Sequence, residues 1–222
     1  MSLPYLDRRE AGRRLAADLR SFAARSDVLV LGLPRGGVPV AYEVARALGA
    51  PLDVFVVRKL GVPGREELAM GAIASGGVRV IVPEVVRALR IGERDLDAVA
   101  DAEYRELERR ERLFRGDREP PDYAGRTVIL VDDGLATGAT MRAAVQALRE
   151  LGPRRIVVAV PAGAAETCAE LEQLADAVIC AATPEPFQAV GLWYRDFTQT
   201  TDEEVRELLA DAAWATARRE DH

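Results

Sequence analysis

The sequence has very little histidine. Its single histidine is His222, the last of 222 residues. Serine and cysteine nucleophiles commonly need imidazole as a base, and many zinc sites use it as a ligand. A Ser-His or Cys-His catalytic apparatus and a histidine-ligated metal centre are therefore not expected. Any catalysis must proceed without imidazole.

Lysine is equally scarce. Lys59 is the one lysine among 30 basic residues, and all the others are arginine. Because a lysine ammonium is a compact point charge that arginine does not reproduce, the residue that escapes this arginine bias is a candidate site residue.

Cysteine and long apolar runs are also scarce. Cys168 and Cys180 lack the CxxC spacing of common metal and redox sites, so we expect two reduced core residues. The sequence contains no run of about 20 apolar residues, and residues 1–20 are charged rather than signal-like. These features predict a cytoplasmic protein with no membrane partner.

Basic charge is not in excess. The formal net charge is −6 and the pI is near 5.1, which argues against nucleic acid as a partner, because affinity for phosphate backbones needs a concentrated basic surface. With 49% hydrophobic residues, the chain can bury a full core. We predict a single domain over residues 1–222.

The most informative stretch that is present lies at residues 127–140. The apolar run 128–131 does not alternate with polar residues, which is typical of a strand buried on both faces of a parallel sheet. Asp132 and Asp133 follow it directly. Carboxylates at this position can accept hydrogen bonds from sugar hydroxyls or hold water around a divalent cation.

A loop of small residues follows the acids, and residues 141–151 predict a helix. Gly134 and Gly138 allow backbone geometry that larger side chains block, and Thr137 and Thr140 supply hydroxyls. Unpaired N–H groups at a helix N-terminus bind anions such as phosphate. Strand, acids and loop together predict a site for a phosphorylated sugar.

Residues 128–140 resemble the phosphoribosyl-pyrophosphate (PRPP) signature of type I phosphoribosyltransferases, and differ chiefly at Gly134, where a larger aliphatic residue is commoner. The resemblance covers most of residues 28–181. It implies an α/β fold with a mostly parallel five-stranded twisted sheet flanked by helices, and a hood or insertion subdomain. It also implies that Asp132 and Asp133 bind the ribose hydroxyls and, through water, Mg²⁺. The residues implied for the 5′-phosphate are Ala136, Thr137, Gly138, Ala139 and Thr140.

A second glycine loop follows the first predicted strand, residues 28–33, and precedes a predicted helix at 39–48. Gly36 and Gly37 let backbone amides approach an anion, and Arg35 can neutralise it, so the loop is a candidate site for pyrophosphate. An ordinary strand-to-helix turn is the alternative. In the resembled family this loop commonly contains a cis peptide, which would fall at or beside Arg35–Gly36.

Arg58 and Lys59 are the remaining candidates for pyrophosphate contact. A strand predicted at residues 52–57 would deliver them to the carboxyl edge of the sheet, where ligands bind in open α/β folds. The alternative is a solvated basic pair at the end of a strand. Under the functional interpretation, Asp132, Asp133, Lys59 and Arg58 form the catalytic set.

Residues 60–120 are predicted to be an insertion in the core at 28–181. Its part at 60–69 has loop composition and lies where the resembled family has a mobile lid, although a loop without function has the same composition. Residues 71–82 predict a β-hairpin turning at Gly76-Gly77. A long charged helix at 93–115 is interpreted as mainly structural, with covering of the site or homodimer formation as the alternatives.

The flanking regions complete the prediction. Residues 3–25 predict an amphipathic helix on the sheet edge, and residues 183–216 a C-terminal hood segment and helix. Further core elements are expected at 155–161 (strand), 164–174 (helix) and 177–181 (strand), and the C-terminal helix is expected at 202–215. Phe187, Trp193 and Tyr194 either contact the acceptor or, together with Phe197, pack the C-terminal helix against the domain. Both interpretations stay open.

The leading hypothesis is a magnesium-dependent phosphoribosyltransferase of nucleotide metabolism. It would transfer the ribose 5-phosphate group of PRPP to a nitrogen acceptor, a nucleobase or similar heterocycle, and release pyrophosphate. Two alternatives are a non-catalytic PRPP-binding regulatory protein and an enzyme that acts on another sugar phosphate, because fold alone does not determine function.

Overall fold

Five parallel strands form the centre of the computed structural model, which describes residues 4–220 and the side chains of residues 4–215. His222 lies outside the described residues. In spatial order the strands are β2 (Leu52–Val54), β1 (Val28–Gly32), β6 (Thr127–Val131), β7 (Arg155–Val160) and β8 (Ala177–Cys180). All residues of β1 and β6 are buried, as their uninterrupted apolar sequences predict. The predicted five-stranded fold is confirmed.

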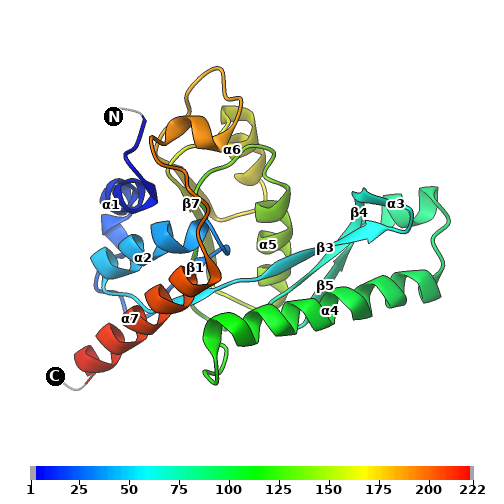
Figure 1. Cartoon of the computed structure of the whole chain (residues 1–222), viewed down its shortest axis with the longest axis horizontal. Helices are drawn as coiled ribbons and strands as arrows, with labels where there is room; N and C mark the ends of the chain where they lie inside the picture. The colour runs from blue at the N-terminus through cyan, green and yellow to red at the C-terminus, as the bar shows by residue number, and fades with distance from the viewer. Residues whose placement is uncertain (1–3, 221–222) are drawn as a thin grey trace.

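Helices cover both faces of this sheet (Figure 1). One face packs against α2 (Gly37–Leu48) and α7 (Asp202–Glu220). The other packs against α5 (Ala139–Glu150) and α6 (Ala165–Leu171). The hydroxyl of Thr201 accepts a hydrogen bond from the Glu204 amide and so caps the start of α7.

The N-terminal helix differs from the prediction. It spans only α1 (Arg8–Asp18), begins at the cap Asp7 and is followed by a 3-10 turn, η1 (Arg20–Phe22). It packs against α2 rather than on the sheet edge. Gly12 permits the close approach, because a Cβ there would lie 2.6 Å from the Val40 carbonyl oxygen.

A second, antiparallel sheet forms an arm that extends from the core (Figure 1). The arm, residues 57–115, consists of β3 (Val57–Val62), β4 (Arg65–Ala74), β5 (Val78–Ile81), α3 (Pro83–Ala88) and α4 (Glu93–Arg115). The bounds of α4 and the turn at Gly76-Gly77, with φ of 85° and 74°, are as predicted.

Two predictions for the arm are wrong. The core strand expected at 52–57 ends at Val54, and the chain continues into β3, so Arg58 and Lys59 belong to the second sheet. Residues 60–69 are a β-hairpin rather than a loop. Only Pro63-Gly64 forms the turn, because Gly64 has a φ of 75°, and the flanking residues pair as strands.

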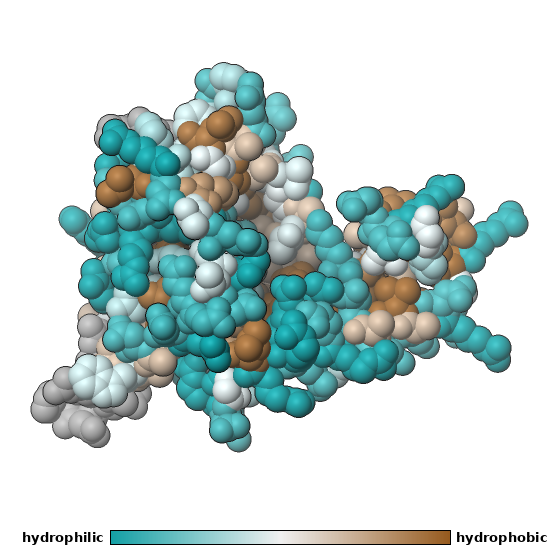
Figure 2. Space-filling model, in the orientation of Figure 1, coloured by the Kyte–Doolittle hydropathy of each residue, from teal (hydrophilic) through white to brown (hydrophobic). Residues whose placement is uncertain are grey.

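The surface in Figure 2 is mostly hydrophilic, with apolar patches on both core and arm. On the arm, the exposed large apolar side chains are Leu68, Val82, Leu89 and Tyr104. Within the described residues, each helix is too short or too polar to cross a bilayer.

A buried ion pair fastens the arm to the core. Arg115, at the end of α4, donates from Nε to Asp53 Oδ2 at 2.9 Å and from Nη2 to the Val54 carbonyl at 2.9 Å. Glu111 accepts a further bond from Arg115 Nη1. The side chains of Arg115 and Asp53 are only 5% and 11% exposed. Removing Arg115 would leave the Asp53 carboxylate buried without its cation.

We therefore expect Arg115→Ala to lower the free energy of unfolding by about 3–5 kcal/mol, measured by urea denaturation. Arg112→Ala, an exposed change three residues earlier on α4, is the matched control and should cost about 0.5 kcal/mol or less. The double variant Arg115→Met with Asp53→Leu should lose less than Arg115→Ala, since it buries no unpaired charge. Equal losses for Arg115→Ala and Arg112→Ala would show that the pair does not fasten the arm.

Candidate functional site

The predicted phosphate loop connects β6 to α5. Gly138 precedes α5 with a left-handed φ of 68°, and a Cβ there would lie 2.5 Å from the Thr167 side chain. Thr167 donates a hydrogen bond to the Ala136 carbonyl oxygen, at 2.7 Å, and so holds the loop from α6. All five residues predicted to bind the 5′-phosphate line a cavity of about 170 Å³ at the N-terminus of α5, together with Asp132 and Val190.

The two acids lie at the carboxyl end of β6. Asp132 Oδ1 accepts a hydrogen bond from the Asp133 amide at 2.8 Å. Burial raises the pKa of Asp132 well above its ordinary value, and the adjacent Asp133 carboxylate raises it further. Burial also raises the pKa of Asp133, against the opposing effect of the Arg8 charge. The pair is therefore a half-buried concentration of negative charge, which a cationic or hydrogen-bonding ligand would stabilise.

The second glycine loop lies directly against these acids. A Cβ on Gly36 would fall 2.1 Å from Asp133 Oδ2, and one on Gly37 would fall 2.7 Å from the Val131 carbonyl oxygen. The peptide bond between Pro34 and Arg35 is cis, one bond before Arg35–Gly36. Only glycine allows this approach, so the structure brings residues 34–37 and the acids together at one edge of the sheet.

The two basic candidates of the arm point in different directions. Arg58 pairs with Glu103 of α4, with Nε 2.7 Å from Oε2. Lys59 is exposed and lies on the opposite face of β3. It is paired with Ala72 of β4, which is paired with Val80 of β5, so the three side chains share one face of the sheet. Val80 packs against the cluster that contains α5, which identifies this face as the one toward α5. Arg35 is half-exposed, with Nη1 3.8 Å from Asp202 Oδ1.

The aromatic side chains after β8 pack against the N-terminal segment. We call residues 183–201 the hood segment. Tyr194 is buried, lies 5.6 Å from the Tyr5 ring, and donates from its hydroxyl to the Asp133 carbonyl oxygen at 2.6 Å. Phe187 and Trp193 stack on each other with ring centroids 6.0 Å apart. The partner of the cluster is therefore Tyr5 rather than the C-terminal helix. Acceptor contact by these residues stays a prediction.

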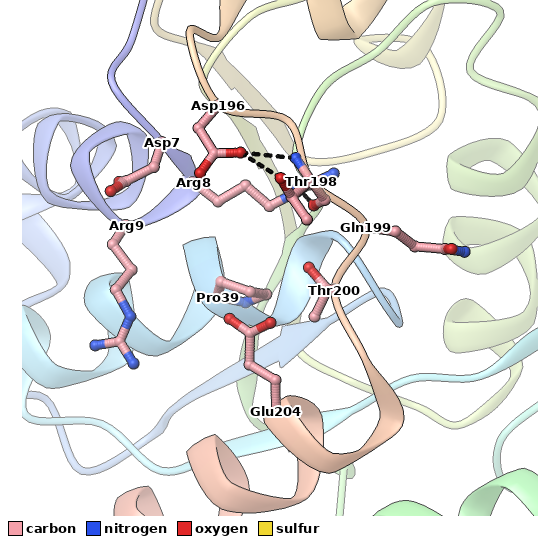
Figure 3. A pocket seen from close by; sticks show the side chains of 9 residues that line it. All are labelled: Asp7, Arg8, Arg9, Pro39, Asp196, Thr198, Gln199, Thr200 and Glu204. Atoms are coloured by element: carbon pink, nitrogen blue, oxygen red, sulfur yellow. Dashed lines mark hydrogen bonds between the residues drawn. The ribbon is translucent and has the colours of Figure 1, made fainter.

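Sequence reasoning missed Arg8. Its guanidinium contacts Asp133 Oδ2 from Nε at 2.8 Å and from Nη2 at 2.8 Å. Arg8 also lines a polar cavity of about 280 Å³ between α1, the start of α2 and the hood segment (Figure 3). An arginine-rich helix so far from the signature gives no local signal for such a contact.

The acids fit a hydrated cation better than a metal cage. Among the described residues, no group of three or more His, Cys, Asp or Glu side chains could hold a metal ion. Oδ2 of Asp133 is already bonded to Arg8, and Oδ1 of Asp132 to the Asp133 amide, which leaves Asp133 Oδ1 and Asp132 Oδ2. Mg²⁺ keeps several waters and commonly takes one or two protein carboxylates plus substrate oxygens, which suits this small donor set.

Comparison with known proteins finds a matching family model and several relatives. The chain matches the family model described as the phosphoribosyl transferase domain over residues 5–192. A Mycobacterium tuberculosis (strain H37Rv) protein that bears the name of a phosphoribosyl transferase is 52% identical over 203 residues, which are 91% of this chain and 46% of that protein. The chain thus spans about half the length of this relative.

Two further relatives match different extents of the chain. The bifunctional protein PyrR of Chloroflexus aurantiacus is 36% identical over 129 residues, which are 57% of this chain and 65% of PyrR. The crystal structure of the protein TT1426 from Thermus thermophilus is similar with a TM-score of 0.83 at 43% identity, and the match covers 94% of this chain and 99% of that one. This likeness therefore includes the arm as well as the core.

The hydrogen bond from Tyr194 to the Asp133 carbonyl gives a prediction for stability. Tyr194→Phe should lower the free energy of unfolding by about 1–3 kcal/mol in urea, because a buried acceptor loses its donor. Tyr104→Phe removes a hydroxyl from an exposed ring and is the control, expected within about 0.5 kcal/mol of the parent. Indistinguishable effects of the two substitutions would contradict a structural role for the bond.

Proposed function

Because the chain belongs to the phosphoribosyl transferase family, we propose that it transfers the ribose 5-phosphate group of PRPP to a nitrogen acceptor, with release of pyrophosphate. The proposed acceptor is a nucleobase or similar heterocycle, and the proposed cofactor is Mg²⁺. The acidic composition is in keeping with a small-molecule acceptor rather than nucleic acid, in a cytoplasmic protein of nucleotide metabolism.

One observation carries the proposal: the phosphate loop, the acid pair and the 34–37 loop converge on one sheet edge. The loop before α5 offers backbone N–H groups to the 5′-phosphate. The free oxygens of Asp132 and Asp133 would accept hydrogen bonds from the ribose hydroxyls. Gly36 and Gly37 let the 34–37 loop lie directly against these acids, so a diphosphate held by that loop would be next to the ribose. A PRPP molecule carries these three groups on one sugar ring.

The proposed reaction separates charge, and the residues supply the means to stabilise it. Positive charge develops on the ribose carbon while negative charge leaves on pyrophosphate. Cations placed in advance near the leaving group therefore stabilise the transition state more than the ground state. Mg²⁺, when bound, would neutralise phosphate charge. Arg58 would have to leave its ion pair with Glu103 to contribute, whereas Lys59 is not part of that pair.

A PRPP-binding regulatory protein is the second candidate. The similarity to a relative named as bifunctional supports it, since that name describes more than one activity on a related chain. An enzyme acting on another sugar phosphate would use the same loop and acids. The three candidates differ in whether PRPP binds and whether pyrophosphate is released.

The direct test is pyrophosphate release from PRPP and Mg²⁺ with a panel of purines, pyrimidines and small amines. We expect release with at least one heterocyclic acceptor. PRPP binding by calorimetry without release for every acceptor would favour the regulatory protein. Absence of PRPP binding would contradict the proposal and favour another sugar phosphate.

Two substitutions separate donor binding from turnover. Asp133→Asn should raise the Kd for PRPP about tenfold or more, equal to at least about 1.4 kcal/mol, because the loss of its charge weakens ribose and cation contacts. Lys59→Ala should lower kcat by about 100-fold with a smaller change in Kd, as expected for a charge that acts on the leaving group. Asp117→Asn and Arg94→Ala, both exposed, are matched controls. Equal, negligible effects of all four changes would assign Asp133 and Lys59 to the scaffold.

A further inference from the structure

The N-terminal segment is built into the predicted donor site. Tyr5 is fully buried, and its hydroxyl donates to the Pro161 carbonyl oxygen at 2.8 Å. Its amide donates to the Trp193 carbonyl, and the Arg195 amide donates to the Tyr5 carbonyl, both at 2.8 Å. These strand-like bonds fix the chain just before α1 and so determine the position of Arg8, the first residue of that helix.

Arg8 is held on three sides. Nε and Nη2 bond Asp133 Oδ2, Nη1 donates to the Thr198 carbonyl oxygen at 2.7 Å, and the guanidinium carbon lies 3.9 Å from the Phe197 ring centroid. The side chain is only 11% exposed. Figure 3 shows it running from α1 to Thr198. A lysine has one compact charge and cannot make this planar set of contacts.

This arrangement leaves Asp133 with one orientation. Arg8 bonds Oδ2, and Gly36 lies against the same oxygen with no room for a Cβ between them. Tyr194 holds the backbone carbonyl of the same residue. Only Oδ1 remains for a ligand, and the positive charge of Arg8 reduces the combined charge of the acid pair, which limits its repulsion of phosphate groups.

We propose that Arg8 is a positioning residue of the PRPP site, which fixes the Asp133 carboxylate and couples it to the hood segment. The inference rests on the proposed function, because it assigns Asp133 to the ribose. Arg8 joins Asp133, an acid of the signature, to Thr198 and Phe197 of the hood segment.

The test is a double-mutant cycle on PRPP affinity, measured by calorimetry with Mg²⁺. Arg8→Gln and Arg8→Lys should each raise the Kd about 10- to 100-fold, the usual effect of removing a group that orients a ligand-binding residue. If Arg8 acts through Asp133, the variant with both Arg8→Gln and Asp133→Asn should bind PRPP no more weakly than Asp133→Asn alone. A merely structural role would change the unfolding midpoint without this non-additivity.

Two variants guard against a folding defect. Arg13→Gln is the matched control on the same helix, because Arg13 pairs with Glu43, which retains Arg9 and Arg46 as partners; PRPP affinity should be unchanged. Phe197→Leu keeps the guanidinium and removes its stacking ring at a 37% exposed position, so affinity should fall in the same direction as in Arg8→Gln, but less.

The failure of each idea has its own signature. If the parent protein binds PRPP and Arg8→Gln binds it equally well, the positioning role is wrong while the proposed function stands. Tighter binding by Arg8→Gln would also overturn it, since Arg8 would then compete with the donor for Asp133. If the parent protein does not bind PRPP, the proposed function fails and this inference fails with it.

Discussion

The partial burial of two adjacent carboxylates at the end of β6 is the constraint on which the site depends. Desolvating a carboxylate costs several kcal/mol even after relaxation, and two neighbours also repel each other. The protein offsets this cost with the Arg8 guanidinium and the Asp133 amide. Because Arg8 comes from α1, a shift of that helix would remove the positive charge that compensates the two carboxylates. The helix in turn is fixed by Tyr5 and by its packing on α2.

A buried carboxylate paired with an arginine also fastens the arm to the core. Asp53 lies in β2, next to β1, and would be an isolated buried charge without Arg115. This pair lies where α4 returns to the core, so the base of the arm is held while the hairpin tip at residues 63–67 is exposed and charged. Lys59 lies between these two regions. If Lys59 acts on the leaving group as we propose, its position depends on the arm, and the insertion would affect turnover without contacting the sugar.

The core strands and the phosphate loop could be predicted because their sequence signals are local. An apolar run without alternation, two acids and a glycine before a helix identify residues 128–140 with no information from elsewhere. The end of β2 could not be predicted, since Val56 and Val57 continue the apolar run after the chain has left the sheet. Arg8 and Asp133 are 125 residues apart, and one arginine in an arginine-rich helix carries no sign of its partner. Such contacts are properties of packing, which sequence patterns do not encode.

The hood aromatics restrict how an acceptor could be recognised. Phe187 and Trp193 already stack on each other with an interplanar angle of 29°, and the Tyr194 hydroxyl already donates to the Asp133 carbonyl. A base that entered between these rings would have to break the stack of Phe187 on Trp193 or the hydrogen bond that holds the Asp133 backbone. Val190, by contrast, lines the phosphate-loop cavity and lies against Gly134, where a Cβ would come within 2.5 Å of it. The small residue at position 134 thus makes room for Val190, which gives the departure from the usual signature a physical cause.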